Sequence, residues 1–350
     1  MGNHPMRRLI VMLACGLVSC GPSGGSGGTE QSAATSEPGT HETAPAVRAV
    51  WIDTDPSIRP GGHEVDDGFA LIQAFHSPEL TIRGVSLVFG NAPLDIEIPI
   101  GRAIVEQYGP PGLEVWVGAA SGEQLGEATE ASTALADALR QERLTILALG
   151  PGTNVGTVLL EHPELASQII EVVAVAGRRP GQRFVTGGTT DSPHCDCNFD
   201  KDTESFRVIL DASVPLTLAP WEISSKVWLG EAELDRLEHA GVSAQYLVRP
   251  ARDWLALWNE RYGVDGFNPF DTLAVGYLTA PETIICDTLP VEILDGPDDR
   301  AVAAGQDPPP NKPYLVVSGE SDSPYVTTYC HTPTAAFTDD LMRRLLAEAS

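Results

Sequence analysis

The sequence predicts an α/β fold: a single domain in which a mostly parallel central sheet is flanked by helices. Short apolar, β-rich runs alternate with stretches of helical periodicity, and turn residues separate them. Strand, helix and strand in that order indicate a largely parallel sheet with helices on both faces. The ligand site of such a sheet lies at the carboxyl ends of its strands.

Six strands are predicted, over residues 48–53, 81–89, 113–118, 144–149, 170–176 and 214–219. Helices are predicted between them, over residues 68–76, 99–108, 131–140 and 154–162. The first helix continues an acidic pair, Asp66 and Asp67, and the last follows a Gly-Pro-Gly-Thr turn. Asp53 and Asp55 fall at the carboxyl end of the first strand, where a ligand site is expected.

The first 46 residues have a different composition from the rest of the chain. Residues 1–20 combine Arg7 and Arg8 with a short apolar run and end in Leu-Val-Ser-Cys, which predicts a lipoprotein signal peptide with lipidation at Cys20. Residues 21–46 are rich in Gly, Ser, Thr, Pro and Glu and predict a flexible linker to a catalytic domain over residues 47–350. We therefore expect a lipid-anchored protein of the bacterial cell envelope, periplasmic or on the outer face. The alternative is an ordinary cleaved signal peptide with an incidental cysteine.

Size and charge limit the classes of partner. The chain has 350 residues, of which 42% are hydrophobic, and its mean hydropathy of -0.05 argues against a multi-span membrane protein. A formal net charge of -26 would repel phosphate backbones and anionic lipid surfaces. We expect a small-molecule ligand rather than a nucleic-acid polymer, and contact with a membrane only through the N-terminal anchor.

Four aspartates, Asp53, Asp55, Asp66 and Asp67, lie within fifteen positions at the end of one predicted strand and the start of the next helix. Alternate residues of a strand share a side, and a helix N-terminus favours anions, so carboxylates from two segments can converge. Such a group repels itself unless a cation lies among its members. Oxygen ligands without His or Cys favour Ca²⁺ or Mg²⁺ over zinc. The alternative is that these residues only cap the helix and line a loop.

Four of the six cysteines follow the linker, in a compartment that permits disulfides: Cys195, Cys197, Cys286 and Cys330. A Cys195 to Cys197 bridge and a Cys286 to Cys330 bridge are both open alternatives at this stage. No Cys-x-x-Cys pair or His-rich tract supports a zinc site.

Five short motifs, in order along the chain, resemble those of the inosine-uridine preferring nucleoside hydrolase family. The first is Asp-Thr-Asp-Pro at 53–56 with the acidic pair at 66–67, and the second is a strand that ends in Gly90-Asn91. Gly-Pro-Gly-Thr-Asn at 150–154 resembles the third, Asp-Cys-Asn at 196–198 the fourth, and Asn-Pro-Phe-Asp-Thr-Leu-Ala-Val at 268–275 the last. The resemblance covers residues 48–345 and implies an N-glycosyl hydrolase that cleaves ribonucleosides.

The resemblance also implies roles for individual residues. In the family one Ca²⁺ is held by Asp side chains and one backbone carbonyl, which here correspond to Asp55, Asp67, Asp271 and the carbonyl of Leu149. Asp66 corresponds to a general base that takes a proton from a water made acidic by the cation. The residues expected to bind the ribose are Asn91, Asp196, Asn198 and Asp53, the last of which orders the site from beside it. The family is usually oligomeric, so a homo-oligomer is expected.

Two features depart from the family pattern. Nine residues, 57–65, separate Pro56 from Asp66 where the family has a much shorter stretch, so a loop is expected near the pocket. Phe270 occupies the position where these enzymes place a His that protonates the leaving base. Trp254 and Trp258 are candidates to activate the leaving base by stacking, with packing in the core as their alternative role.

Two other functions fit parts of the sequence. The Asp-Thr-Asp start resembles haloacid-dehalogenase-type phosphatases, but the acidic pair at 66–67 has no place in that machinery. A catalytically inactive, lipid-tethered nucleoside- or ribose-binding protein is the stronger alternative, because Phe270 and the 57–65 loop are real divergences. Asp66 favours the enzyme, since a second carboxylate beside the attacking water is needed for hydrolysis and not for binding.

Overall fold

A computed structural model describes residues 47–187 and 193–347. The predicted signal peptide, the linker and Cys20 lie outside these residues. The strands of the described part are β1 (Arg48–Thr54), β2 (Leu80–Leu87), β3 (Val115–Val117), β4 (Leu144–Ala148), β5 (Ile169–Ala174), β6 (Leu216–Leu218), β7 (Ile284–Pro297), β8 (Asn311–Val317) and β9 (Val326–Pro333). The helices are α1 (Asp66–Phe75), α2 (Leu94–Tyr108), α3 (Glu130–Gln141), α4 (Thr153–Glu161), α5 (Cys197–Lys201), α6 (Thr203–Asp211), α7 (Trp221–Ser224), α8 (Glu231–Glu238), α9 (Val242–Tyr262), α10 (Thr272–Thr279), α11 (Asp299–Ala303) and α12 (Ala336–Leu345). Three 3₁₀ turns complete them: η1 (Gly122–Gln124), η2 (Pro163–Gln168) and η3 (Pro281–Thr283).

The strands form one sheet in the order β3-β2-β1-β4-β5-β6-β9-β7-β8. Strands β1 to β6 and β9 pair in parallel, whereas β7 runs antiparallel to both of its neighbours, β9 and β8. The predicted α/β fold with a mostly parallel sheet is confirmed, and each of the six predicted strands is present. The chain leaves β1 toward β2 on one side and later returns to β4 on the other, which creates a switch point at the carboxyl end of β1.

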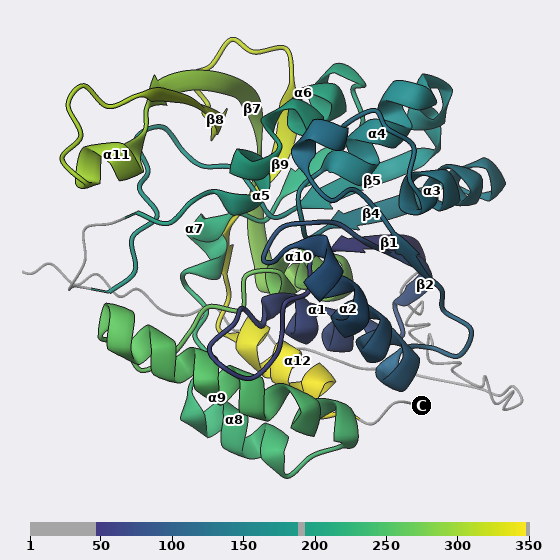
Figure 1. The fold of residues 1–350 in the computed structure, drawn as a ribbon, viewed down its shortest axis with the longest axis vertical. Helices are drawn as coiled ribbons and strands as arrows, with labels where there is room; N and C mark the ends of the chain where they lie inside the picture. Colours follow the sequence, from purple (N-terminus) through teal and green to yellow (C-terminus); the bar gives the residue numbers. More distant parts are fainter. Residues whose placement is uncertain (1–46, 188–192, 348–350) are drawn as a thin grey trace, which may run out of the picture. The chain divides into compact units, whose positions relative to one another are not determined.

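Helices cover both faces of the sheet, as Figure 1 shows. Val50 and Ile52 of β1 join an apolar cluster with α1, α10 and α12, whereas Trp51 between them joins a second cluster with α3, α4 and α6. This alternation follows from the two-residue repeat of a strand whose two faces are both buried. No described helix has both the length and the apolar character that crossing a bilayer requires.

Two parts of the fold differ from the sequence prediction. Helix α2 begins at Leu94 and contains Pro99, which had been predicted as its first residue. Strands β7, β8 and β9 were not predicted, and exposed and buried residues mix irregularly along β7. Cys286 of β7 pairs with Cys330 of β9 across the sheet as a disulfide, and Cys195 pairs with Cys197.

Candidate active site

Asp55, directly after β1, is fully buried and held in one orientation. Its Oδ2 accepts a hydrogen bond from the backbone N–H of Asn91 at 2.8 Å, while Oδ1 has no partner among the described residues. A Cβ on Gly90 would lie 1.7 Å from Oδ2, and one on Gly150 would lie 3.0 Å from Oδ1. Glycine at both positions therefore makes room for this carboxylate at the ends of β2 and β4.

Asp66 and Asp67 begin α1, where the helix dipole favours negative charge. Asp67 Oδ1 accepts hydrogen bonds from Thr54 Oγ1 and, at 3.1 Å, from the backbone N–H of Asp55. Its Oδ2 accepts one from Asn91 Nδ2 at 3.0 Å. Asp67 is thus fixed to the end of β1, while Asp66 lines the adjoining cavity.

Asp271, just before α10, completes a group of three buried carboxylates. One oxygen each from Asp66, Asp67 and Asp271 lies within 4.8 Å of the others. Burial, followed by repulsion from Glu64 and Asp67, raises the pKa of Asp66 well above its usual range. Burial and the charges of Asp66 and Asp67 do the same for the pKa of Asp271. The residues come from opposite ends of the described sequence, and the fold brings them together.

The donor set fits a hard divalent cation. The grouped atoms are carboxylate oxygens, and Asp55 Oδ1 is buried without a partner among the described residues. Burial, and then the charge of Asp67, raise the pKa of Asp55 well above its usual range. A buried carboxylate without a partner is costly unless a cation or a proton neutralises it. The backbone carbonyl of Leu149 lines the same cavity and accepts a hydrogen bond from Asn198 Nδ2 at 2.5 Å. The buried aspartate cluster is consistent with the family's metal site.

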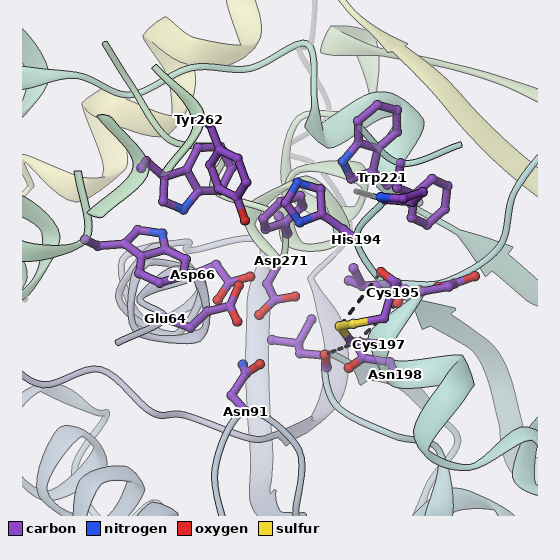
Figure 2. A pocket seen from close by; sticks show the side chains of 18 of the residues that line it. Glu64, Asp66, Asn91, His194, Cys195, Cys197, Asn198, Trp221, Tyr262 and Asp271 are labelled. Atoms are coloured by element: carbon purple, nitrogen blue, oxygen red, sulfur yellow. Dashed lines mark hydrogen bonds between the residues drawn. A yellow bond between two sulfur atoms is a disulfide. The ribbon is translucent and has the colours of Figure 1, made fainter. Parts of the chain in front are cut away.

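The carboxylates open into a cavity of about 330 Å³. Eight of the residues predicted from the sequence line it: Asp66, Asn91, Leu149, Asp196, Asn198, Trp254, Trp258 and Asp271. Figure 2 shows Asn91, Asn198 and the carboxylates around its lower part, with Tyr262 and Trp221 across its upper part. Asp55 and Asp67 are buried and are not among the residues that line the cavity.

Asp53 does not line the cavity. Its Oδ1 accepts hydrogen bonds from Ser86 Oγ at 2.5 Å and from Asn154 Nδ2 at 2.8 Å, so it joins β1 to β2 and α4. Burial raises its pKa to about 7, against the lowering effect of these two hydrogen bonds. These bonds agree with a residue that orders the site from beside it, whereas direct contact with a ribose stays a prediction.

Asp196 and Asn198 are positioned by the carboxyl end of β5. Asp196 Oδ2 accepts a hydrogen bond from the backbone N–H of Gly177 at 2.9 Å, and burial raises the pKa of Asp196 to about 6 despite the nearby charge of Arg178. Asn198 Nδ2 bridges the carbonyls of Leu149 and, at 3.2 Å, Val175. Both side chains line the cavity, and their contact with a ribose remains a prediction.

The aromatic side of the cavity comes mainly from α9. Trp254, Trp258 and Tyr262 follow one another at intervals of four residues and so share a face of the helix. Trp258 is only 2% exposed, and its ring lies 6.2 Å from that of Phe270. It therefore packs in the core and lines the cavity at once, so that the two roles considered for it from the sequence are compatible.

The 57–65 loop connects the acidic and aromatic sides. The backbone N–H of Gly61 donates to Asp253 Oδ2 of α9 at 2.8 Å, and Ile58 is buried against Gly68 of α1. Glu64, near the end of the loop, lines the cavity, and burial followed by the charge of Asp67 raises its pKa to about 7. The loop thus supplies a further carboxylate to the site.

Residues 50–319 match the sequence family described as inosine-uridine preferring nucleoside hydrolase. This chain belongs to that family. It is 26% identical over 262 residues to the pyrimidine-specific ribonucleoside hydrolase RihA of Klebsiella pneumoniae, an alignment that covers 67% of this chain and 80% of RihA. It is 26% identical over 274 residues to the pyrimidine-specific ribonucleoside hydrolase RihB of Escherichia coli, covering 70% of this chain and 83% of RihB.

Solved structures of nucleoside hydrolases share the fold. A plant nucleoside hydrolase superposes with a TM-score of 0.69 at 18% identity, covering 87% of this chain and 100% of the plant chain. The inosine-uridine preferring nucleoside hydrolase of Bacillus anthracis superposes with a TM-score of 0.66 at 16% identity, covering 85% of this chain and 99% of that chain. The prediction of an N-glycosyl hydrolase is confirmed at the level of the family.

Sequence reasoning missed several cavity residues of this nucleoside hydrolase: His194, Trp221 and Tyr262. Tyr262 could have been found, since it continues the four-residue spacing of Trp254 and Trp258. His194 directly precedes the Cys-Asp-Cys segment, but nothing in the sequence indicates which way its ring points. Trp221 begins the short helix α7 after β6 and carries no sequence signal of its own.

Proposed function

We propose that this protein hydrolyses the N-glycosidic bond of a ribonucleoside, or of a closely related ribosyl compound, to free base and ribose with Ca²⁺ as cofactor. The observation that carries the proposal is the group of buried carboxylates at the edge of a cavity whose other side is aromatic. One side suits a cation and sugar hydroxyls, and the other suits a flat heterocycle.

The metal would be held by Asp55, Asp67, Asp271 and the carbonyl of Leu149. When bound, Ca²⁺ holds hydroxyl groups of the ribose and raises the acidity of water. Asp66, which lines the cavity with a raised pKa, takes a proton from the attacking water. The water oxygen then bonds to the anomeric carbon as the carbon–nitrogen bond breaks.

The cavity residues Asn91, Asp196 and Asn198 hold the ribose hydroxyls. Asp53 orders the site from beside it. Positive charge gathers on the sugar ring in the transition state, so hydrogen bonds to its hydroxyls and nearby carboxylates stabilise it. The relatives named for pyrimidine nucleosides make uridine and cytidine suitable first substrates.

The test is a panel of purine and pyrimidine ribonucleosides given to the purified full-length chain, with Ca²⁺ or with chelator, and a measurement of reducing sugar. Asp66→Asn should lower kcat by about 100-fold or more while Ca²⁺ binding persists. Asp55→Asn should weaken Ca²⁺ binding as well as turnover. If Asp66→Asn hydrolyses nucleosides at the wild-type rate, and Asp55→Asn binds Ca²⁺ but is inactive, then Asp55 rather than Asp66 is the base.

The second candidate is a nucleoside- or ribose-binding protein without activity. Phe270 favours it, because the residue expected to protonate the leaving base is absent from that position. Binding of ribonucleosides without release of base across the panel would decide for the binder.

The N-terminal residues support a proposed location. The sequence at 17–21 and the linker that follows favour a lipid anchor at Cys20 in the bacterial cell envelope. Cys20→Ala should move the protein from the detergent phase to the aqueous phase in a phase partition, whereas an unchanged partition would contradict the anchor. A homo-oligomer is likewise proposed from the family, and the mass of the purified protein in solution tests it.

A further inference from the structure

Two buried nitrogen atoms in the cavity lack a hydrogen-bond partner among the described residues. They are His194 Nε2 and Trp221 Nε1, and both residues line the cavity. Figure 2 shows the two rings above the carboxylate of Asp271 and well away from Asn91. They therefore lie on the aromatic side of the cavity, apart from the residues proposed to hold the ribose.

Phe184 contacts both residues, through the backbone of His194 and through the ring of Trp221. The backbone N–H of His194 donates to the carbonyl of Phe184 at 2.7 Å, and the ring of Trp221 stacks on that of Phe184 with centroids 5.1 Å apart and planes 12° apart. The His194 ring meets Tyr262 edge-on at 5.0 Å and lies nearly parallel to Trp258 at 6.4 Å. Rings supported on several sides keep one orientation, which a donor needs if it is to select a ligand atom.

The chemistry of the two groups defines what they can bind. An indole N–H only donates a hydrogen bond. Burial, and then the charge of Arg261, lower the pKa of His194, and among the described residues the titratable side chain of Tyr262 also contacts its ring. The imidazole is therefore neutral near pH 7 and carries one N–H. Neither ring nitrogen has a partner among the described residues; Trp221 Nε1 donates, and His194 Nε2 donates in its Nε2–H tautomer. Such a pair favours a ligand with carbonyl oxygens or ring nitrogens, as a nucleobase has.

Building on the proposed function, we propose that His194 and Trp221 form the subsite for the departing base, where His194 Nε2 donates a hydrogen bond to a base heteroatom on which negative charge gathers. Phe270 cannot serve this purpose, because it has no polar atom. The electron pair of the broken carbon–nitrogen bond goes to the base. The base takes up the proton that the water gave to Asp66, by way of solvent, and His194 keeps its own proton.

The test compares two substrates that differ only in how much help the leaving group needs. Inosine and uridine carry bases that leave poorly as anions, whereas the nitrophenolate of p-nitrophenyl β-D-ribofuranoside leaves readily. His194→Ala should lower kcat on the nucleosides by about 100-fold and leave the nitrophenyl riboside within about threefold of wild type. His194→Gln keeps an N–H donor and should recover about tenfold of the nucleoside loss. Trp221→Phe keeps an aromatic ring but removes the indole N–H, and it should raise KM for nucleosides by about tenfold.

A control variant and the pattern of losses on the two substrates decide whether His194 acts on the leaving base. The matched control is His239→Ala at an exposed position after α8, which should leave both substrates unchanged. Equal losses of kcat on both substrates, or no loss on either, would overturn the base-subsite assignment. A thermal unfolding transition of His194→Ala that responds to Ca²⁺ is the check that the variant is folded. A wild-type chain that hydrolyses neither substrate contradicts the proposed hydrolase, and in that case weaker binding of inosine by His194→Ala still supports the subsite.

Discussion

Individual residues at the end of β1 show how tightly the site is specified. Asp55 touches Gly90 and Gly150 so closely that neither position has room for a side chain. The same carboxylate has one oxygen bonded to the N–H of Asn91 and one oxygen without a partner in the described part of the chain. The glycines therefore make room for Asp55, the proposed metal ligand, and do not serve backbone flexibility, since neither has a positive φ.

The replacement Gly90→Ala tests this interpretation. Its Cβ would lie 1.7 Å from Asp55 Oδ2, so the carboxylate must move. We expect Ca²⁺ affinity to fall by about tenfold or more, together with a loss of stability of about 1–3 kcal/mol from overpacking. Titration of Ca²⁺ by thermal shift measures both effects. Gly319→Ala is the control, because its Cβ would come no closer than 3.7 Å to a neighbour, and equal behaviour of the two variants would refute the steric argument.

At the scale of elements, the 57–65 loop connects the aromatic helix α9 to the acidic residues of the site. It is anchored to α9 through Asp253 and delivers Glu64 to the cavity. After burial, the charge of Glu64 is the largest contribution that raises the pKa of Asp66. The loop therefore acts on the proposed general base through electrostatics as well as through shape.

Glu64→Gln removes that charge. The pKa of Asp66 should fall, so the base stays ionised to lower pH and the acid limb of the kcat/KM profile should move to lower pH. Profiles measured with saturating Ca²⁺ between pH 4 and 8 check the direction. Glu320→Gln, at an exposed position, is the charge-matched control. A shift toward higher pH, or none, would separate Glu64 from the base.

A second prediction at this scale concerns the unpredicted antiparallel strands. The disulfide between Cys286 and Cys330 joins β7 to β9 across a separation of 44 residues, away from the cavity lining. The double variant Cys286→Ser, Cys330→Ser should lower the free energy of unfolding by about 2–4 kcal/mol and leave kcat nearly unchanged. Denaturant unfolding without reductant measures the first, and an unaltered midpoint would contradict it.

At the scale of the whole molecule, the buried acidic residues lower stability when they ionise, and the proposed cation would offset this effect. Besides the proposed ligands, Glu97 is buried, and burial raises its pKa to about 8, with a further contribution from the charge of Asp67. Carboxyl groups with a raised pKa in the folded state favour folding fully below their unfolded pKa near 4, and this contribution is lost as pH rises through about 7 to 8.

The stabilisation by Ca²⁺ should therefore increase with pH. Without metal, the midpoint of thermal unfolding should fall between pH 5 and 8 as the site ionises, whereas Ca²⁺ should offset most of this fall by binding the ionised carboxylates. The difference between midpoints with Ca²⁺ and with chelator, measured across this range, is the test. A difference that does not change with pH, or chelator-resistant turnover, would count against the proposed metal site.

Much of this molecule could be predicted from the order of its motifs. The strands before residue 219, and the placement of Asp55 at a strand end, follow from apolar runs and turn residues that are local in sequence. The convergence of Asp271 on Asp66 and Asp67 was expected only from the family resemblance, because about two hundred residues separate them and no local pattern encodes that contact. The antiparallel strands β7 and β8 were missed, since the burial along β7 depends on its neighbours.

The sequence by itself determined the α/β class, the family and the acidic residues of the proposed cation site, because these depend on periodicity, composition and short motifs. The tertiary structure decided what surrounds those residues. The loop that carries Glu64 is bonded to α9, and Glu64 lines the cavity. The ring nitrogens His194 Nε2 and Trp221 Nε1 have no hydrogen-bond partner among the described residues, and both residues line the aromatic side of the cavity. The direction of a side chain and the loss of its water depend on packing between distant segments, which local sequence does not specify.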